Sequence, residues 1–338
     1  MIADALSVLA DLRGNTGRFE EAERVRREAF EIRVREQGAT HPDAFNDADA
    51  LGRLLVGRGR YEEAEALVED QLRLIRASQG EWNEAYSQAL NTREMIRVGQ
   101  ARYAEAEQDM ARVVEIRLKI YGEQHTLVAE GLNNLCFLAH ARGAYREAEG
   151  HCRAALKITR ALYGEESPQQ GTQLINLGKA LQGQGRLDEA EQEFRRSFTL
   201  RQAQWGADNP QLATPLQHLG NLIRLRGGHT EAVPMLRQAV AMNTELLGDE
   251  HPSQAIAWAS LGMALRDAGQ AAEAEAFFRK SLDLFRRKKL TAHVKYAELL
   301  SEFGSLLDES GRADEARPLL EEAEARARKV ADASSAKP

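Results

Sequence analysis

The stretch GRYEEAE at residues 59–65 decides the fold, because close copies of it return every 42 residues along the chain. GRFEEAE begins at residue 17, ARYAEAE at 101, GAYREAE at 143 and GRLDEAE at 185. A fixed period of this length marks a repeat protein, in which each unit packs on its neighbours. The alanine of the phrase, always preceded by glutamate, recurs without exception as Ala22, Ala64, Ala106, Ala148, Ala190, Ala232, Ala274 and Ala316.

Each unit is predicted to contain two helices. The second begins at the repeated phrase, where glutamates in the first turn suit the helix dipole, and apolar residues follow at helical spacing. A polar residue followed by proline, as in His41–Pro42 and Asn209–Pro210, then starts the first helix of the next unit. Left-handed glycine caps are predicted to end the second helices at Gly38, Gly80, Gly122, Gly164, Gly206 and Gly248.

The first helices carry leucines beside a small residue, which is Cys136, Gly178, Gly220 or Gly262. Small residues at this position are expected to let two helices approach closely.

The spacing from Gly178 to Ala190, with Leu174, Leu177, Leu181 and Phe194 around them, resembles the tetratricopeptide consensus. The longer period and the phrases LYGEESP and LLGDEHP are similar to the kinesin light chain variety, and residues 131–149 are its closest copy. Period and resemblance together predict an all-α, right-handed superhelical solenoid of eight helix-turn-helix repeats. The expected units are 1–42, 43–84, 85–126, 127–168, 169–210, 211–252, 253–294 and 295–330, with a disordered tail at 331–338.

The composition fits a folded protein, with 43% hydrophobic residues, 29% charged residues and a formal net charge of -7. A negative balance argues against general attraction to nucleic acid or anionic lipid, and no apolar stretch approaches a membrane span. Only two cysteines occur, Cys136 and Cys152, which excludes a disulfide framework and a cysteine-based zinc site. We therefore expect a cytoplasmic protein without a metal or cofactor.

The third unit departs most from the pattern. It has Arg93 and Glu94 where other copies carry leucine and a small residue, and Arg97 at a usually apolar position. Charges in a helix seam reduce stability unless they are solvated or paired. Two interpretations stay open: the unit packs loosely and acts as a bend, or the charged pair serves a partner. The basic run at residues 286–289 is interpreted as a solvated helix end rather than a nucleic-acid contact.

Nothing in the sequence indicates catalysis. Cys152 stands where other units have Phe194 or Leu236, so it is predicted to be a core residue, and the paired carboxylates are expected on solvated faces. One repeat position interchanges histidine with asparagine and serine, which predicts helix capping rather than metal binding. Its residues are His41, Asn83, His125, Ser167, Asn209, His251 and His293.

The first helix of each unit is expected to line a concave groove. Asparagine recurs at the inward positions although it is a poor helix former, and its amide can donate to and accept from a peptide backbone at once. The resemblance adds that such asparagines hold an extended peptide in related arrays; the alternative is that asparagine merely tolerates a wet groove. The predicted peptide-binding residues are Asn91, Met95, Asn133, Asn134, Phe137, Asn176, Lys179, His218 and Asn221.

The expected function is a non-enzymatic scaffold that binds an extended segment of a partner protein through units three to six. Phe137 and Met95 are predicted to form an exposed apolar patch, so the ligand is expected to carry a large apolar side chain and an acidic residue for Lys179. Neither nucleic acid nor a membrane is an expected partner. Three alternatives stay open: the scaffold region of a larger signalling protein such as a bacterial kinase, which the abrupt start of the array at residue 3 fits; a self-assembling structural protein; and a small-ligand sensor.

Overall fold

The computed structural model describes residues 2–15, 18–288, 290 and 294–335. The chain divides into two compact units, Met1–Arg186 and Leu187–Pro338. The helices of the first unit are α1 (Ile2–Asn15), α2 (Phe19–Gln37), α3 (Pro42–Gly57), α4 (Tyr61–Gln79), α5 (Glu84–Gly99), α6 (Tyr103–Tyr121), α7 (Thr126–Ala141), α8 (Tyr145–Tyr163) and α9 (Gly171–Gly183). Those of the second unit are α10 (Leu187–Trp205), α11 (Ala213–Leu225), α12 (His229–Leu247), α13 (Pro252–Asp267), α14 (Ala271–Arg287), α15 (Val294–Glu309) and α16 (Ala313–Ser335).

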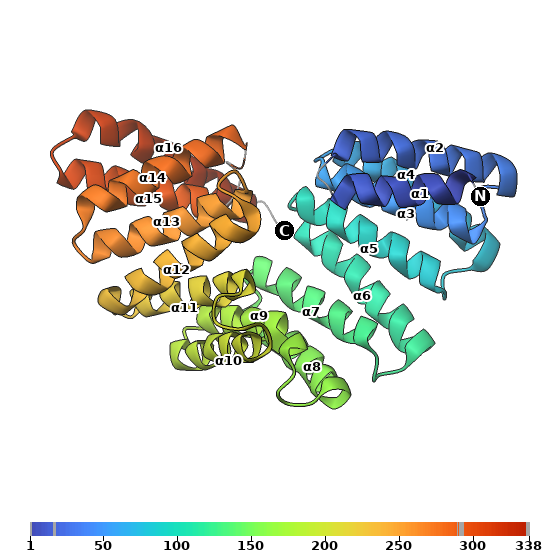
Figure 1. Ribbon diagram of the computed structural model, residues 1–338, viewed down its shortest axis with the longest axis horizontal. Helices are drawn as coiled ribbons and strands as arrows, with labels where there is room; N and C mark the ends of the chain where they lie inside the picture. Colours follow the sequence, from blue (N-terminus) through green and yellow to red (C-terminus); the bar gives the residue numbers. More distant parts are fainter. Residues whose placement is uncertain (1, 16–17, 289, 291–293, 336–338) are drawn as a thin grey trace. The chain divides into compact units, whose positions relative to one another are not determined.

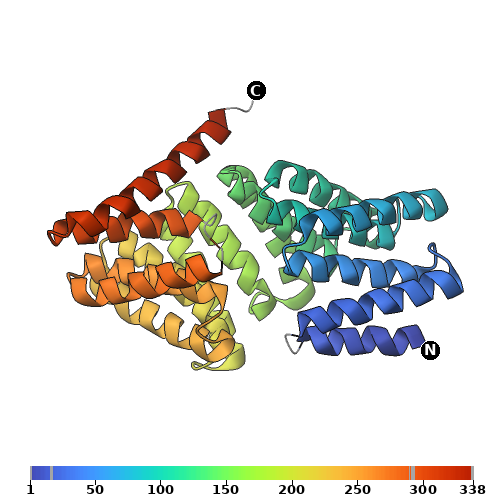
Figure 2. The same ribbon diagram turned by 90° about the horizontal axis from the view of Figure 1, so that it is seen from above.

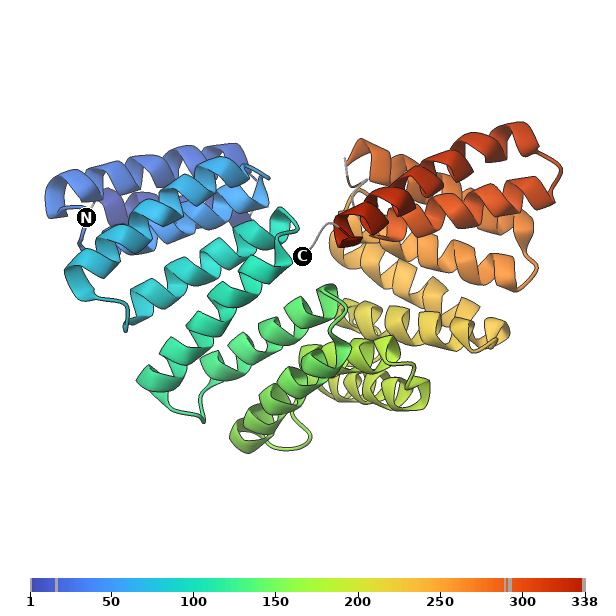
Figure 3. The ribbon, with the colours of Figure 1, turned by 180° about the vertical axis from the view of Figure 1, so that it is seen from behind.

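Within each unit the helices pair into hairpins, and each hairpin packs on the next one along the chain. In the first unit, α1–α2, α3–α4, α5–α6 and α7–α8 form pairs, and α9 packs on α8 (Figure 1). Figure 2 shows α1 to α4 side by side in chain order. In the second unit, α10 packs on the α11–α12 hairpin, and α13–α14 and α15–α16 follow (Figure 3). The all-α fold of helical hairpins is confirmed; the count of eight repeats and the right-handed sweep of the array stay predictions.

The glycines predicted to end the second helices all have positive φ, from 76° at Gly248 to 92° at Gly38. Their ψ is extended where a cap is defined, for example 177° at Gly122, and this region is open almost only to glycine. The prediction of glycine with positive φ is confirmed, although the conformation is more extended than the left-handed helical one. The turns inside the hairpins need positive φ as well, and there Ala101 adopts a φ of 59° without being glycine.

The capping prediction is confirmed for the six residues of that repeat position that the structure describes. Each begins a helix, and its side chain accepts a hydrogen bond from a backbone N–H two or three residues on. Oδ1 of Asn83, for example, accepts from the backbone N–H of Tyr86 at 2.9 Å. The histidines at this position accept the bond with the lone pair of Nδ1. That lone pair is one of those with which an imidazole would bind a metal ion. His293 lies outside the described residues.

The small-residue position packs as predicted. A Cβ added to Gly220 would lie 2.7 Å from the Leu236 side chain, and one added to Gly262 would lie 2.6 Å from Phe278. Each glycine thus touches the residue sixteen positions on, in the second helix of its own hairpin. The repeated alanines are buried throughout, so glycine and alanine together set how closely the helices approach.

Cys136 and Cys152 occupy this same pair of positions in the α7–α8 hairpin and are joined by a disulfide bond. Both are fully buried, which confirms a core residue at Cys152 and a close-packed small residue at Cys136. Neither prediction included a bond between the two cysteines, which the register brings face to face, with their Cα atoms 5.3 Å apart. The exclusion of a framework of several disulfides is compatible with this single bond, which links α7 to α8.

The charged residues of the third repeat, residues 85–126, are largely paired with other residues of the same compact unit, Met1–Arg186. Arg93 donates to both oxygens of Asp109, at 3.0 and 2.6 Å, and to Glu69 at 2.7 Å. Arg97 donates to Asp109 at 2.6 Å. This pairing favours a structural role for Arg93, because its charge is already neutralised within the hairpin and by α4, and a contact of the Arg93–Glu94 pair with a partner stays untested. Loose packing at this unit agrees with one observation: α5 and α7 make little direct contact, whereas α3 and α5 do.

Glu94 is the charged residue of this unit without such a pair. It takes the small-residue position of α5 and is 6% exposed. Burial, with the nearby Asp109 carboxylate, raises the pKa of Glu94 to about 7.

Two predictions concern the C-terminal part of the chain. The helix α16 continues to Ser335, so residues 331–335 of the predicted disordered tail are helical, as their alanines favour; residues 336–338 lie outside the described residues. Arg286, Arg287 and Lys288 form ion pairs with Glu322, Asp283 and Glu250. These pairs agree with a solvated helix end.

Candidate functional site

The predicted groove residues fall in both units, so the structure shows which of them meet only within each unit. Asn91 and Met95 lie in α5, Asn133, Asn134 and Phe137 in α7, and Asn176 and Lys179 in α9, all in the first unit. His218 and Asn221 lie in α11 of the second unit.

Two of the asparagines bind each other. The Asn176 amide in α9 donates to Oδ1 of Asn133 in α7 at 3.0 Å. This bond leaves the amide N–H groups of Asn133 and the carbonyl of Asn176 without a partner among the described residues. Neither Asn91 nor Asn134 has a hydrogen bond from the described part of the chain. The first helices therefore present amides that can still bind a peptide backbone.

The same two helices bring Phe137 and Lys179 together. Nζ of Lys179 lies 5.6 Å from the centroid of the Phe137 ring, within the range of a cation–π contact. The Phe137 side chain is 37% exposed, which makes it an apolar surface at this position. The repeat places both residues at one position of successive first helices, and contact between α7 and α9 joins them.

Lys179 is half-buried and has no carboxylate partner among the described residues. Burial lowers its pKa, since an ammonium group loses hydration there. Burial and the charge of Lys179 lower the pKa of the neighbouring His140 to about 4, so His140 is neutral near pH 7. The site thus holds one cation whose charge no described residue neutralises.

Met95 does not join this pair. Because α5 and α7 make little contact, the predicted apolar patch of Met95 and Phe137 is not supported by the packing of their helices. The apolar surface of the site rests on Phe137.

In the second unit, the predicted residues have partners within the chain. The Asn221 amide donates to Oγ of Ser260 at 3.2 Å, and Gln217 donates to the same oxygen at 3.4 Å. The His218 ring stacks on Phe194 with the ring centroids 5.3 Å apart. Asn221 and His218 are thus partly engaged in holding helices together, unlike Asn91 and Asn134.

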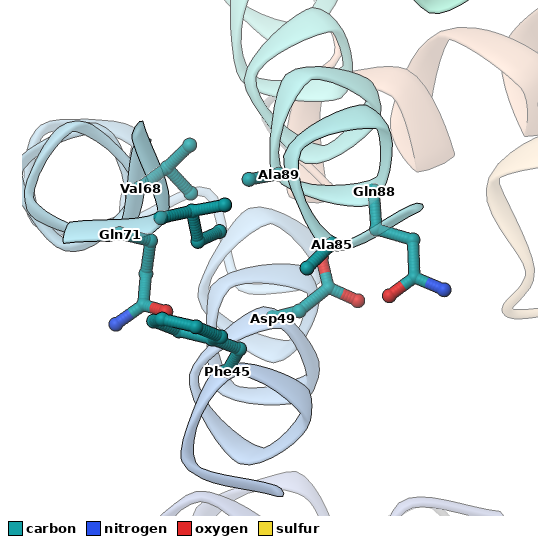
Figure 4. Close-up of a pocket in the computed structure, with 8 residues that line it drawn as sticks. Phe45, Asp49, Val68, Gln71, Ala85, Gln88 and Ala89 are labelled. Carbon is teal, nitrogen blue, oxygen red and sulfur yellow. The ribbon is translucent and has the colours of Figure 1, made fainter. Parts of the chain in front are cut away.

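A small enclosed cavity lies between α3, α4 and α5 (Figure 4). Its volume is about 10 Å³, close to the space of one water molecule. Asp49 on its wall accepts hydrogen bonds from Thr92 and Arg53, and burial raises the pKa of Asp49. Oε1 of Gln71, also on the wall, is buried without a protein partner. The size suits a single water and excludes an organic ligand at this place.

A ladder of ion pairs between successive hairpins escaped the sequence analysis. The last glutamate of the repeated phrase accepts from an arginine 37 residues on, at the start of the next second helix. The pairs are Glu23–Arg60 at 2.6 Å, Glu65–Arg102 at 2.8 Å, Glu149–Arg186 at 2.6 Å and Glu275–Arg312 at 2.8 Å. The sequence does contain a signal for this ladder, because the glutamate and the arginine both recur at the 42-residue period. The expectation that the carboxylates are simply solvated is therefore wrong for these glutamates.

In the described ranges, no three histidine, cysteine, aspartate or glutamate side chains come together as a possible metal site. None of the described helices is both long enough and apolar enough to cross a membrane.

Several solved structures resemble the chain. BtubC (BKLC) from P. vanneervenii is 28% identical with a TM-score of 0.55, over 60% of this chain and 81% of that one. Nearly identical repeats of a putative kinesin light chain from Podosopora anserina are 22% identical with a TM-score of 0.48, over 61% of this chain and 98% of that one. The apo form of RapI, 12% identical with a TM-score of 0.64 over 86% of this chain and 99% of that one, shares the fold.

No curated protein matches the sequence. One tetratricopeptide repeat model matches residues 1–77, 127–203, 210–287 and 253–329, and a second matches residues 98–127. Together these segments cover most of the chain and agree with the helical hairpins and their glycine and alanine contacts. The chain therefore belongs to the tetratricopeptide repeat family.

Proposed function

We propose that this chain is a non-enzymatic scaffold that binds an extended segment of a partner protein on the first helices of its first unit. The fold is typical of protein–protein interaction. The observation that carries the proposal is the Phe137–Lys179 pair: an exposed ring beside a cation without a counter-ion. Such a pair offers an apolar contact and a charge contact within one short segment of a ligand.

The ligand we propose has a large apolar side chain over Phe137 and an acidic side chain near Lys179. Packed helices lie about 8–10 Å apart, and an extended peptide advances roughly 3.3 Å per residue. The two ligand side chains are therefore about three residues apart. The amide groups of Asn133 and Asn176 that remain free supply hydrogen bonds to the ligand backbone.

The same observations weigh against the other candidate functions. The cavity between α3, α4 and α5, of about 10 Å³, has no room for a small organic ligand, and the larger hollow at residues 163–169, of about 580 Å³, is widely open to solvent. The basic residues 286–288 are neutralised by carboxylates. The tetratricopeptide repeat fold is typical of non-enzymatic scaffolds, so we propose that the chain is not an enzyme. A cytoplasmic location stays a prediction, and the buried Cys136–Cys152 bond, of a kind that oxidising compartments favour, weighs against it.

Fluorescence anisotropy with designed nine-residue peptides tests the proposal. One peptide carries tryptophan and aspartate three residues apart, a second has asparagine in place of the aspartate, and a third has alanine in place of the tryptophan. We expect the first peptide to bind most tightly. The ratio of its affinity to that of the second peptide should fall at high salt, because salt screens the charge contact.

Variants of the chain locate the binding. Each of Phe137→Ala and Lys179→Glu is expected to reduce the affinity for the first peptide about tenfold or more, as for residues that anchor an interface. Matched controls on α8 are Leu162→Ala, which removes a similarly exposed apolar side chain, and Lys157→Glu, which makes the same charge change at an exposed site. Equal binding by all four variants would refute the site. A loss with Phe137→Ala alone would remove only the acidic part of the motif.

A further inference from the structure

Lys179 differs from the other lysines of the chain. Among the lysines whose side chains the structure describes, only Lys179 and Lys295 are half-buried, and the rest are exposed. Lys295 donates to Glu298 at 2.7 Å. Lys179 is the one described lysine that is both half-buried and without a carboxylate partner among the described residues. Neither full hydration nor an ion pair therefore stabilises its ammonium form.

The groups around Lys179 bury part of its side chain and offer no opposite charge to its amine. Phe137 lies beneath Nζ at 5.6 Å. The titratable neighbour on α7 is His140, which is neutral near pH 7, and no carboxylate of α7, α8 or α9 pairs with Lys179. The lowered pKa of Lys179 agrees with this placement. A free amine is the nucleophilic form of lysine, and burial is the usual way proteins increase it.

We infer that Lys179 is a modification site, the lysine of this chain that an activated acyl donor such as an acyl thioester acylates first. The lone pair of Nζ attacks the thioester carbonyl carbon, a C–N bond forms, and the C–S bond breaks with its electron pair leaving on sulfur. The proton lost from nitrogen passes to the thiolate or to water, so no oxidant or reductant takes part. The product is a neutral amide beside the Phe137 ring.

This modification would regulate the proposed function, on which its consequence rests. Acylation removes the one unneutralised charge beside Phe137, and the acidic side chain of a bound peptide loses its counter-ion. The apolar contact with Phe137 remains. Acylated chain is therefore expected to bind the tryptophan–aspartate peptide no better than the tryptophan–asparagine peptide.

The test uses the full folded chain with acetyl-coenzyme A as the acyl thioester, and mass spectrometry of peptides to follow each lysine from pH 6.5 to pH 9.5. Lys157, exposed on α8 in the same unit, is the internal reference. Each rate is divided by that of the same lysine in denatured chain, which removes the effect of local sequence.

Lys179 is expected to react faster than Lys157 at pH 7.5, by about threefold for each unit by which burial lowers the pKa of Lys179. A tenfold gain in free amine is partly offset by lower nucleophilicity, with a Brønsted slope of about 0.5 as for thiols. The pH at which the rate reaches half its maximum should also be lower for Lys179. Asn176→Asp, one helical turn before Lys179, supplies a carboxylate and should slow Lys179 while leaving Lys157 unchanged.

A Lys179 rate equal to or below that of Lys157, or no response to Asn176→Asp, overturns the modification site. Because this labelling needs no peptide, its outcome is independent of the proposed function. Lys179→Gln, which copies the neutral amide, and Lys179→Arg, which keeps the charge, then test the consequence with the tryptophan–aspartate peptide. Fast labelling with equal binding by both variants would keep the modification site and overturn the groove.

Discussion

Replacing Glu94 with glutamine measures the cost of the buried carboxyl group in α5. Other repeats place glycine, alanine or cysteine at this position, whereas Glu94 lies in the α5–α6 hairpin at 6% exposure. It lies near Asp109 of α6, whose carboxylate accepts hydrogen bonds from Arg93 and Arg97 of α5, the helix that carries Glu94. Both guanidinium groups are thus directed to Asp109, and an ionised Glu94 is left with a like charge beside it.

The magnitude follows from the pKa of Glu94, which burial and Asp109 raise from 4.5 to about 7. At pH values well below 4.5, folded and unfolded chains are both protonated and the group has no effect. As the pH rises through this range, the unfolded chain releases its proton first, so the free energy of unfolding falls until about pH 7. One pKa unit corresponds to about 1.4 kcal/mol, so the full loss is roughly 3 kcal/mol.

Glu94→Gln keeps the shape and removes the ionisation. We expect the variant to be slightly more stable than the parent at pH 5 and about 3 kcal/mol more stable at pH 8. Urea unfolding at both pH values measures this difference. Hydrogen exchange over residues 84–121 localises it, because stability in repeat arrays is local. Exchange at residues 85–100 should be fastest in the parent at pH 8, apart from the termini.

The control is Glu130→Gln, which changes the same group at an exposed position of α7. Its effect should stay within about 0.5 kcal/mol at either pH. A Glu94→Gln effect that is the same at pH 5 and pH 8 would refute the reasoning, because the benefit would then come from packing and not from ionisation.

Three further substitutions probe the helix contacts. Ala190→Leu overpacks a fully buried alanine of α10 and should lower stability by about 1–3 kcal/mol in thermal melts; a neutral result would show that the register is wrong. Ala101→Gly relieves a φ of 59° and should stabilise by about 1 kcal/mol, whereas Ala111→Gly within α6 should destabilise by a similar amount. Breaking the Cys136–Cys152 bond with a thiol reductant frees a link across 16 residues and should cost about 3 kcal/mol; Cys136→Gly with Cys152→Leu, the pair found at Gly220 and Leu236, should unfold identically with and without reductant.

The candidate site was predictable in its positions but only partly in its contacts. The register placed Phe137, Lys179, Asn133 and Asn176 on successive first helices, and contact between α7 and α9 joins them in pairs. The same register placed Met95 one repeat earlier, yet α5 and α7 make little contact. Whether two equivalent positions meet depends on how closely their helices pack, and a period carries no information on that distance.

The sequence by itself determined the elements whose causes are local. The helices, the glycines with positive φ such as Gly38, the capping residues such as Asn83 and the buried alanines all follow from residues within one unit. The repetition of these signals every 42 residues makes each one reinforce the others. Local backbone preferences and a single buried face are enough to specify them.

Only the tertiary structure decided which side chains are partners. It joined Cys136 to Cys152, directed Arg93 to Asp109, and linked Glu23 to Arg60 across 37 residues. It also left Lys179 without a counter-ion among the residues that the structure describes. Charges are plentiful in this sequence, and many pairings satisfy the same composition. The choice among them depends on side-chain length, rotamer and the spacing between helices, because an ion pair or a disulfide forms only within a few ångströms.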